Sequence, residues 1–329
     1  MTGVDVRLIT PDGVQRRDPG ELAELLAGDG IVWVDVPTWD DGCAELLTKH
    51  FDLHPRASAD CANRNPVPKV HVYPEHVFLV LHAPERGDRG HVHYLELDQF
   101  VGPGYLVTVH GPVSPKVAPG AATAETDAVA RRLDAGRLHP GSAAELSFAV
   151  VTALANRLRT CLTELTELTE EVWRLEQIVT GGHLGDPEQF LEELFQVRHG
   201  LLTVRTMSAL SREVYGRMTT LPALPGPAWT ADAEDQFRRV AAMADSQREY
   251  LQGVIEFYQT RTNTKMTIAA ERLAVIAALT LPITAVSSVM GMNVIVNDAT
   301  RVGELVLLLV GMAIMSAAVL VWARRKGWF

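Results

Sequence analysis

The chain has 329 residues and a formal net charge of −10, with 40 acidic residues against 30 lysines and arginines. This length allows more than one domain, and the acidic balance disfavours nucleic acid as a partner and favours cations. Cys43, Cys61 and Cys161 lack metal-ligand spacing, so they argue against a disulfide framework and for a reducing compartment. The first residues contain no basic segment followed by an apolar core, so we expect no secretory signal and a cytoplasmic N-terminal region.

Residues 1–140 predict a cytoplasmic α/β domain. Short runs rich in β-branched and aromatic residues, several bounded by glycine or proline, are typical of strands. We expect strands at 4–9, 31–36, 70–73, 77–82, 94–101 and 105–110. Helices are expected at 19–26, 41–51 and 122–135.

Three histidines lie close together in this domain. His91 and His93 would share one face of a strand, and His82 precedes them by nine residues or more. This spacing suggests a zinc site without being diagnostic of one, and no cysteine joins the set. Ordinary strand and loop histidines are the alternative.

Residues 141–271 predict a helical stalk. Apolar residues recur at helical spacing over 146–180, and a second helix is expected to begin after Asp186 and to end near Met218. A third helix is expected from about Thr230 into the apolar segment that follows. A polar helix of this length needs neighbours to pack against, so the stalk indicates an oligomer.

Two charge-free segments close the chain. No charged residue lies between Arg272 and Asp298, which exceeds the ~20 apolar residues that a membrane-spanning helix needs. We expect a first span at 272–293, an outer loop at 294–304, a second span at 305–323 and a basic tail at 324–329. The positive-inside rule then places both termini in the cytoplasm of a two-span protein of the cell membrane.

One face of the first span is narrow and mildly polar. It carries small side chains and hydroxyls at spacings of three and four residues: Leu273, Ala277, Leu281, Thr284 and Ser288. Such a face is suited to helix packing or to lining a pore. Pro282 lies within the span and frees a backbone carbonyl one turn earlier, which needs a partner inside a membrane.

The end of this span carries a recognisable motif. Gly291, Met292 and Asn293 end a proline-containing span and are followed by a short loop and a second span. This arrangement resembles the signature of CorA-type divalent metal-ion transporters of the two-transmembrane GxN superfamily. The resemblance extends to residues 280–284, to Gly303-Glu304-Leu305 and to strand-like residues 105–110. Met290 departs from the family, which commonly has tyrosine before this motif.

The resemblance implies a CorA-like fold: an N-terminal α/β domain, long stalk helices and two C-terminal membrane helices, in a homopentameric funnel. It implies that Gly291, Met292 and Asn293 form the selectivity filter, with the polar face of the first span lining the pore. A ring of asparagine carbonyls can hold Mg²⁺ with its water shell, because this ion prefers oxygen ligands and dehydrates reluctantly. Asp298 and Glu304 of the outer loop would attract cations to the mouth.

The resemblance also implies regulatory Mg²⁺ between subunits. Asp232 and Asp235 fall where the family carries its stalk aspartates, and Asp88 or Glu85 would be the partner on the neighbouring subunit. Carboxylates near the start of a helix also complement its dipole, which is the structural alternative for the stalk pair. Bound Mg²⁺ would hold the channel closed by removing repulsion between these carboxylates.

Two other functions stay open. A Zn²⁺ transporter of the same superfamily, with or without proton coupling, shares these motifs, and Co²⁺ is a further candidate cargo. A membrane-anchored scaffold without transport would not need the polar face of the first span. An enzyme is not expected, because the sequence contains no glycine-rich phosphate loop, nucleophile elbow or catalytic His/Cys/Asp arrangement.

Overall fold

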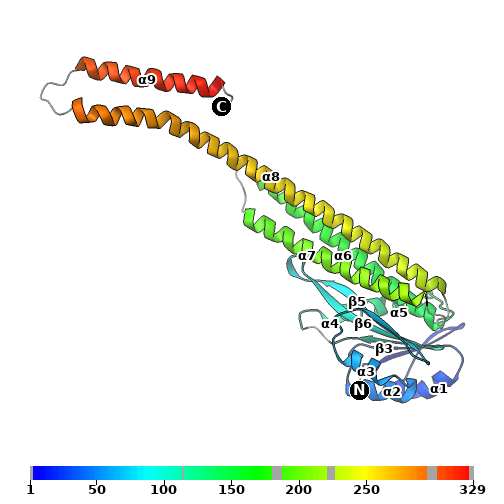
Figure 1. Cartoon of the computed structure of the whole chain (residues 1–329). Coiled ribbons are helices and arrows are strands. Elements are labelled where there is room, and N and C mark those ends of the chain that lie inside the picture. Colours follow the sequence, from blue (N-terminus) through cyan, green and yellow to red (C-terminus); the bar gives the residue numbers. More distant parts are fainter. Residues whose placement is uncertain (1–2, 113–114, 180–186, 221–226, 295–301, 326–329) are drawn as a thin grey trace. The chain divides into compact units, whose positions relative to one another are not determined.

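The computed structural model describes residues 3–112, 115–179, 187–220, 227–294 and 302–325. The chain forms two compact units, Met1–Gln252 and Gly253–Phe329. The first contains a mixed sheet with helices, and the second contains the end of one long helix and a further helix (Figure 1).

The sheet of the first unit has seven strands in the order β2-β1-β3-β7-β6-β5-β4. Their bounds are β1 Asp5–Thr10, β2 Gly13–Arg17, β3 Ile31–Val36, β4 Lys69–Val72, β5 Val77–Arg86, β6 Val92–Val101 and β7 Tyr105–His110. The central pair β3–β7 is parallel and every other pair is antiparallel. Both central strands are almost completely buried, as expected for strands covered on both faces.

Helices cover both faces of the sheet (Figure 1). On one face, α1 Leu22–Ala27, α2 Asp41–Phe51 and α3 Pro55–Ala62 pack against alternate valines and phenylalanines of the strands. On the other face lies α6 Ala143–Val179, which contacts β3, β5, β6 and β7 as well as α5 Ala124–Asp134. Short turns of helix occur at η1 Pro19–Glu21, η2 Asp88–Gly90 and α4 Pro119–Ala122.

The long helices pack on one another in the first unit. The helices α7 Pro187–Met218 and α8 Pro227–Val294 complete a bundle with α6. Aromatic pairs join its members: Phe148 of α6 with Trp229 of α8, and Tyr215 of α7 with Phe237 of α8. The helix α8 begins three residues before the expected start near Thr230, because Pro227 is its first residue. Proline is favoured there since the first turn needs no intrahelical N–H donor.

The second unit consists of the C-terminal part of α8 and α9 Val302–Arg325, which lie side by side (Figure 1). Among the described residues, one helical stretch, within Ala228–Ser288, is long and apolar enough to cross a membrane. Only 6% of its most apolar window is buried, whereas the core helix of a soluble protein would be mostly buried.

Candidate ion-permeation face and metal ligands

The two faces of α8 in the second unit differ in burial. Val275 is buried, and Leu279, Pro282, Ile283 and Val286 are half-buried, which marks the side that packs along α9. The predicted pore residues lie on the opposite side and are exposed in the single chain: Leu273, Ala277, Leu281, Thr284 and Ser288. The structure therefore brings these five residues onto one outward face of a continuous helix.

Hydroxyl groups along this segment bond to their own helix. Thr284 Oγ1 donates to the carbonyl of Thr280 at 2.8 Å, and Thr280 Oγ1 donates to that of Ala277 at 3.4 Å. Ser287 Oγ instead lies 4.0 Å from Met312 Sδ of α9. A threonine that donates inward keeps its oxygen lone pairs directed outward as acceptors, which is the polarity that a cation or its water shell requires.

The predicted filter residues occupy the last turn of α8. Gly291, Met292 and Asn293 are helical, and the helix ends at Val294. Glu304 lies in the first turn of α9, and Asp298 lies outside the described residues. The filter and outer-mouth assignments stay predictions.

Glu85, one of the predicted regulatory ligands, is already neutralised within the chain. It ends β5 and accepts a hydrogen bond from Arg157 Nη2 of α6 at 2.6 Å. Arg157 also contacts Glu125 Oε1 at 2.9 Å and donates to the carbonyl of Ala121 at 2.8 Å. Glu85 would have to give up a charge-assisted hydrogen bond before it could bind a metal ion.

The two stalk aspartates have different surroundings. Asp235 forms ion pairs with Arg238 and Arg239, one turn further along α8. Asp232 is exposed and makes no ion pair among the described residues. Neither lies in the first turn of α8, so the proposed role of capping the helix is wrong: Asp232 is the sixth residue of the helix.

Asp88 begins the η2 turn between β5 and β6, and it is exposed. Of the four predicted regulatory carboxylates, Asp88 and Asp232 are therefore the two that have no basic partner within the described part of the chain. The structure holds a single copy, so contacts between subunits stay predictions.

The predicted histidine set divides in two. His82 is buried, and its Nε2 lies 2.9 Å from the carbonyl of Asn65. Burial lowers the pKa of His82, the hydrogen bond to Asn65 opposes this, and the neutral ring is favoured. His91 and His93 lie beside each other at the end of the β5–β6 hairpin, with ring centroids 4.5 Å apart. No group of three histidine, cysteine, aspartate or glutamate side chains within the described ranges is already arranged to hold a metal ion.

Two further carboxylates lie under α3, and no sequence pattern predicted their burial. Asn65 donates to Glu96 from its backbone N–H at 2.7 Å and from its side-chain amide at 2.5 Å. Asp98, on the same face of β6, is fully buried. Burial, then the charge of Glu96, raises the pKa of Asp98 well above its usual range, so this carboxyl favours its neutral form. Such a closed pair is a structural feature and not a metal site.

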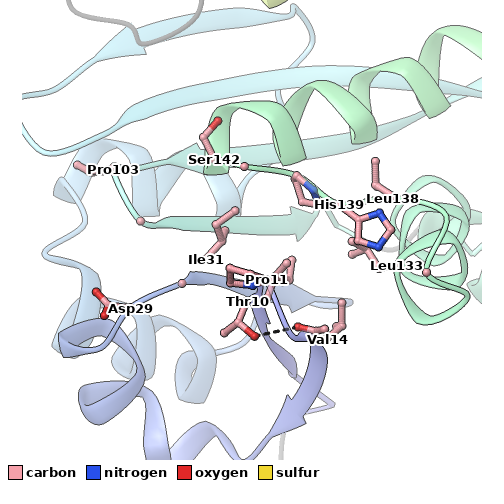
Figure 2. Close-up of a pocket in the computed structure, with 17 residues that line it drawn as sticks. Thr10, Pro11, Val14, Asp29, Ile31, Pro103, Leu133, Leu138, His139 and Ser142 are labelled. Atoms are coloured by element: carbon pink, nitrogen blue, oxygen red, sulfur yellow. Dashed lines mark hydrogen bonds between the residues drawn. The ribbon is translucent and has the colours of Figure 1, made fainter.

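A cavity of about 570 Å³ lies at the end of the sheet where β1, β3 and β7 meet the start of α6 (Figure 2). It contains a histidine, a serine and an aspartate, and Asp29 lies on the opposite side from His139. Ser142 Oγ accepts from the backbone N–H of Glu145 at 3.2 Å and so caps α6. No hydrogen bond links these three groups in the part of the chain that the structure describes.

The family assignment rests on almost the whole chain. The family model described as "CorA-like Mg2+ transporter protein" matches residues 28–325. The chain belongs to this CorA-like family. The family is one of membrane-integral transporters of Mg²⁺ and is not a family of enzymes. A comparison with curated protein sequences gave no match.

Solved structures confirm the CorA-like fold. The complete CorA magnesium transporter from Methanocaldococcus jannaschii superposes with a TM-score of 0.79 at 15% identity, covering 99% of this chain and 98% of that one. The full-length CmaX protein gives 0.74 at 16% identity, covering 99% and 97%. The cytoplasmic domain of ZntB from Vibrio parahaemolyticus RIMD 2210633 gives 0.58 at 10% identity, covering 79% of this chain and all of that one. At these identities the likeness concerns the fold alone.

Proposed function

We propose that this chain is a passive divalent-cation channel that admits Mg²⁺ into the cytoplasm. The observation that carries the proposal is the outward face of α8 in the second unit. Its five exposed residues present hydroxyl, methyl and leucine side chains without any charge, on the side opposite α9. Several copies of this face around an axis would form an uncharged, partly hydroxylated pore.

The chemistry of this face suits weak capture of a hydrated ion. Thr284 and Ser288 would offer oxygen acceptors to the water shell of Mg²⁺, which the ion releases reluctantly. Leu273 and Leu281 are 67% and 66% exposed and would form apolar constrictions that close by dewetting. The absence of carboxylates from the face favours exit as well as entry. Inside-negative voltage would drive a doubly charged ion inward by about 4.6 kcal/mol per 100 mV.

We assign the remaining parts as follows. Residues 141–271 serve as the stalk of a homopentamer, Gly291, Met292 and Asn293 form the filter, and Asp298 and Glu304 draw cations to it. Asp232 and Asp88 are the preferred ligands for regulatory Mg²⁺, since Glu85 and Asp235 are engaged by arginines. High cytoplasmic Mg²⁺ would then favour the closed state.

The pore is tested by Mg²⁺ flux into proteoliposomes. Thr284→Val keeps the shape and removes the acceptor, and we expect at least about tenfold slower flux, since a hydrogen bond to a charged partner contributes about 1.5–3 kcal/mol. Ser316→Ala is the matched control, because that hydroxyl donates to Met312 of its own helix on α9. Equal flux in wild type and Thr284→Val would refute the pore face, as would loss in Ser316→Ala alone.

The same vesicles test the ion and its regulation. Parallel measurements with Zn²⁺ and Co²⁺ identify the cargo, and Zn²⁺ flux without Mg²⁺ flux would overturn the ion assignment. Asp232→Asn should weaken closure by internal Mg²⁺. Asp245→Asn is the control on the same helix, since Asp245 is paired with Arg205 and Arg248. Unchanged closure in Asp232→Asn would remove this residue from the sensor.

A further inference from the structure

Two glycines, Gly90 and Gly200, allow the β5–β6 turn to approach α7 closely. Gly90 has a φ of +82°, and a Cβ at this position would lie 3.3 Å from the backbone of Val197. A Cβ on Gly200 would lie only 2.4 Å from the carbonyl oxygen of Gly90. The backbone of the β5–β6 turn therefore contacts the backbone of α7 directly. This contact fixes the positions of the neighbouring residues of the turn and of α7 relative to one another.

Three histidines flank this contact. His91 follows Gly90, His93 is the second residue of β6, and His199 precedes Gly200 on α7. The His91 ring centroid lies 4.5 Å from that of His93 and 6.3 Å from that of His199. His91 and His199 are exposed and His93 is half-buried. No hydrogen bond to a ring nitrogen of these three residues occurs in the described part of the chain.

The His91–His93 separation of 4.5 Å lies within the range for imidazoles that share a metal ion, and the His91–His199 separation of 6.3 Å lies just above it. With metal–nitrogen distances of about 2.0–2.1 Å, two coordinating rings have centroids roughly 4.5–6 Å apart, depending on the angle at the metal. The rings do not yet converge on one point in the conformation described. Binding would require the His91 and His199 side chains to rotate, and both are exposed and make no ring hydrogen bond within the described residues.

The electrostatic surroundings favour the metal-binding form of His91. Burial, then the charges of His93, His199 and Lys116, lowers the pKa of His91. Neutral imidazole is the form that ligates metal ions.

We propose that His91, His93 and His199 bind one transition-metal ion, with Zn²⁺ as the reference ion and water at the remaining position. Three imidazole nitrogens suit Zn²⁺, Co²⁺ or Ni²⁺ and do not suit Mg²⁺, which takes oxygen ligands. This site lies within one chain and is distinct from the pore and from the carboxylates assigned to regulatory Mg²⁺. It would tie the β5–β6 turn, which includes Asp88, to α7.

The test is Zn²⁺ binding by the full-length protein in detergent, measured by competition with a fluorescent chelator in excess Mg²⁺. The excess Mg²⁺ occupies oxygen-ligand sites. His91→Gln and His199→Gln should each weaken Zn²⁺ binding by at least about tenfold, since even groups behind the ligands contribute about 10–100-fold in other sites. His71→Gln, at an exposed histidine on β4, is the matched control and should bind as wild type does.

Three results would overturn the site: unchanged affinity in His91→Gln, unchanged affinity in His199→Gln, or an equal loss in His71→Gln. Thermal unfolding of each variant without Zn²⁺ separates ligand loss from misfolding, because the surface substitutions should leave the metal-free midpoint unchanged. A visible spectrum of the Co²⁺ form gives an independent readout, and the intense bands of low-coordinate Co²⁺ should disappear in His199→Gln. Binding is measured without transport, so the result does not depend on the proposed channel function.

Discussion

Replacing Arg157 by alanine should destabilise the first unit more than any change to an exposed ion pair. Arg157 is 16% exposed and holds two carboxylates, Glu85 at 33% and Glu125 at 1% side-chain exposure. Removing the guanidinium leaves Glu125 buried without its cation, which costs about 3–5 kcal/mol in comparable cases. For a domain of this size, 3 kcal/mol corresponds to roughly 6–12 °C in the unfolding midpoint.

The matched control is Arg86→Ala. Arg86 lies 3.7 Å from Glu164, and both side chains are about two-fifths exposed, so its loss should cost only ~0–1 kcal/mol. The unfolding midpoints of these two variants are compared with that of a double variant, Glu125→Gln with Arg157→Met. The double variant removes both buried charges. The double variant should recover much of the loss, because no buried unpaired charge remains: Glu85, which also loses its arginine, is 33% exposed and stays in contact with water. If Arg157→Ala proves no worse than Arg86→Ala, the buried pair does not stabilise the unit as argued.

Two further substitutions test local features. Gly200→Ala should lower the unfolding midpoint, because its Cβ would meet the Gly90 carbonyl oxygen at 2.4 Å; Gly216→Ala, with contacts at 3.6 Å, should be neutral or stabilising in the same assay. The pKa of His110 is raised, because the nearby Asp35 carboxylate and its hydrogen bond, with Glu125, outweigh the burial that would lower it. The resulting stability is complete below the ordinary pKa of about 6.5 and is lost as pH rises through the folded-state value. The urea midpoint of unfolding should therefore fall more between about pH 6 and about pH 8 in wild type than in His110→Gln. Equal falls in the two proteins would contradict this assignment.

Local patterns were enough to locate much of the fold. The strands at 31–36 and 105–110 and the helix at 41–51 have the predicted bounds, because each is a continuous apolar or amphipathic run with clear ends. The strand β2 was missed, since its exposed sequence GVQRR has no apolar alternation, although Pro11-Asp12-Gly13 marks a turn before it. The helix α3 was missed because its N-cap is His54, a residue that seldom signals a helix start.

The ligand assignments show which contacts a sequence can reveal. The pairing of Asp235 with arginines three and four residues later was readable from helical spacing. The pairing of Glu85 with Arg157 joins residues 72 positions apart and depends on how α6 crosses β5. In the same way, His82 was grouped with His91 and His93 because the three are close in the sequence. In the structure, the ring of His199 from α7 lies near His91 instead. Distance along the chain was a poor guide wherever a helix and the sheet supply one side chain each.

The central parallel pair of strands has a consequence for biosynthesis. The strand β3 can pair with β1 early, but it cannot pair with its parallel neighbour until β7 has been translated, so closure of the sheet waits for residue His110. The first apolar segment begins only at Leu273, and at about 5–20 residues per second the ribosome needs roughly ten to thirty seconds to reach it. Mixed sheets close in far less time than that. The sheet can therefore mature in the aqueous phase before any part of the nascent polypeptide requires lipid, and a failure of insertion would leave it folded.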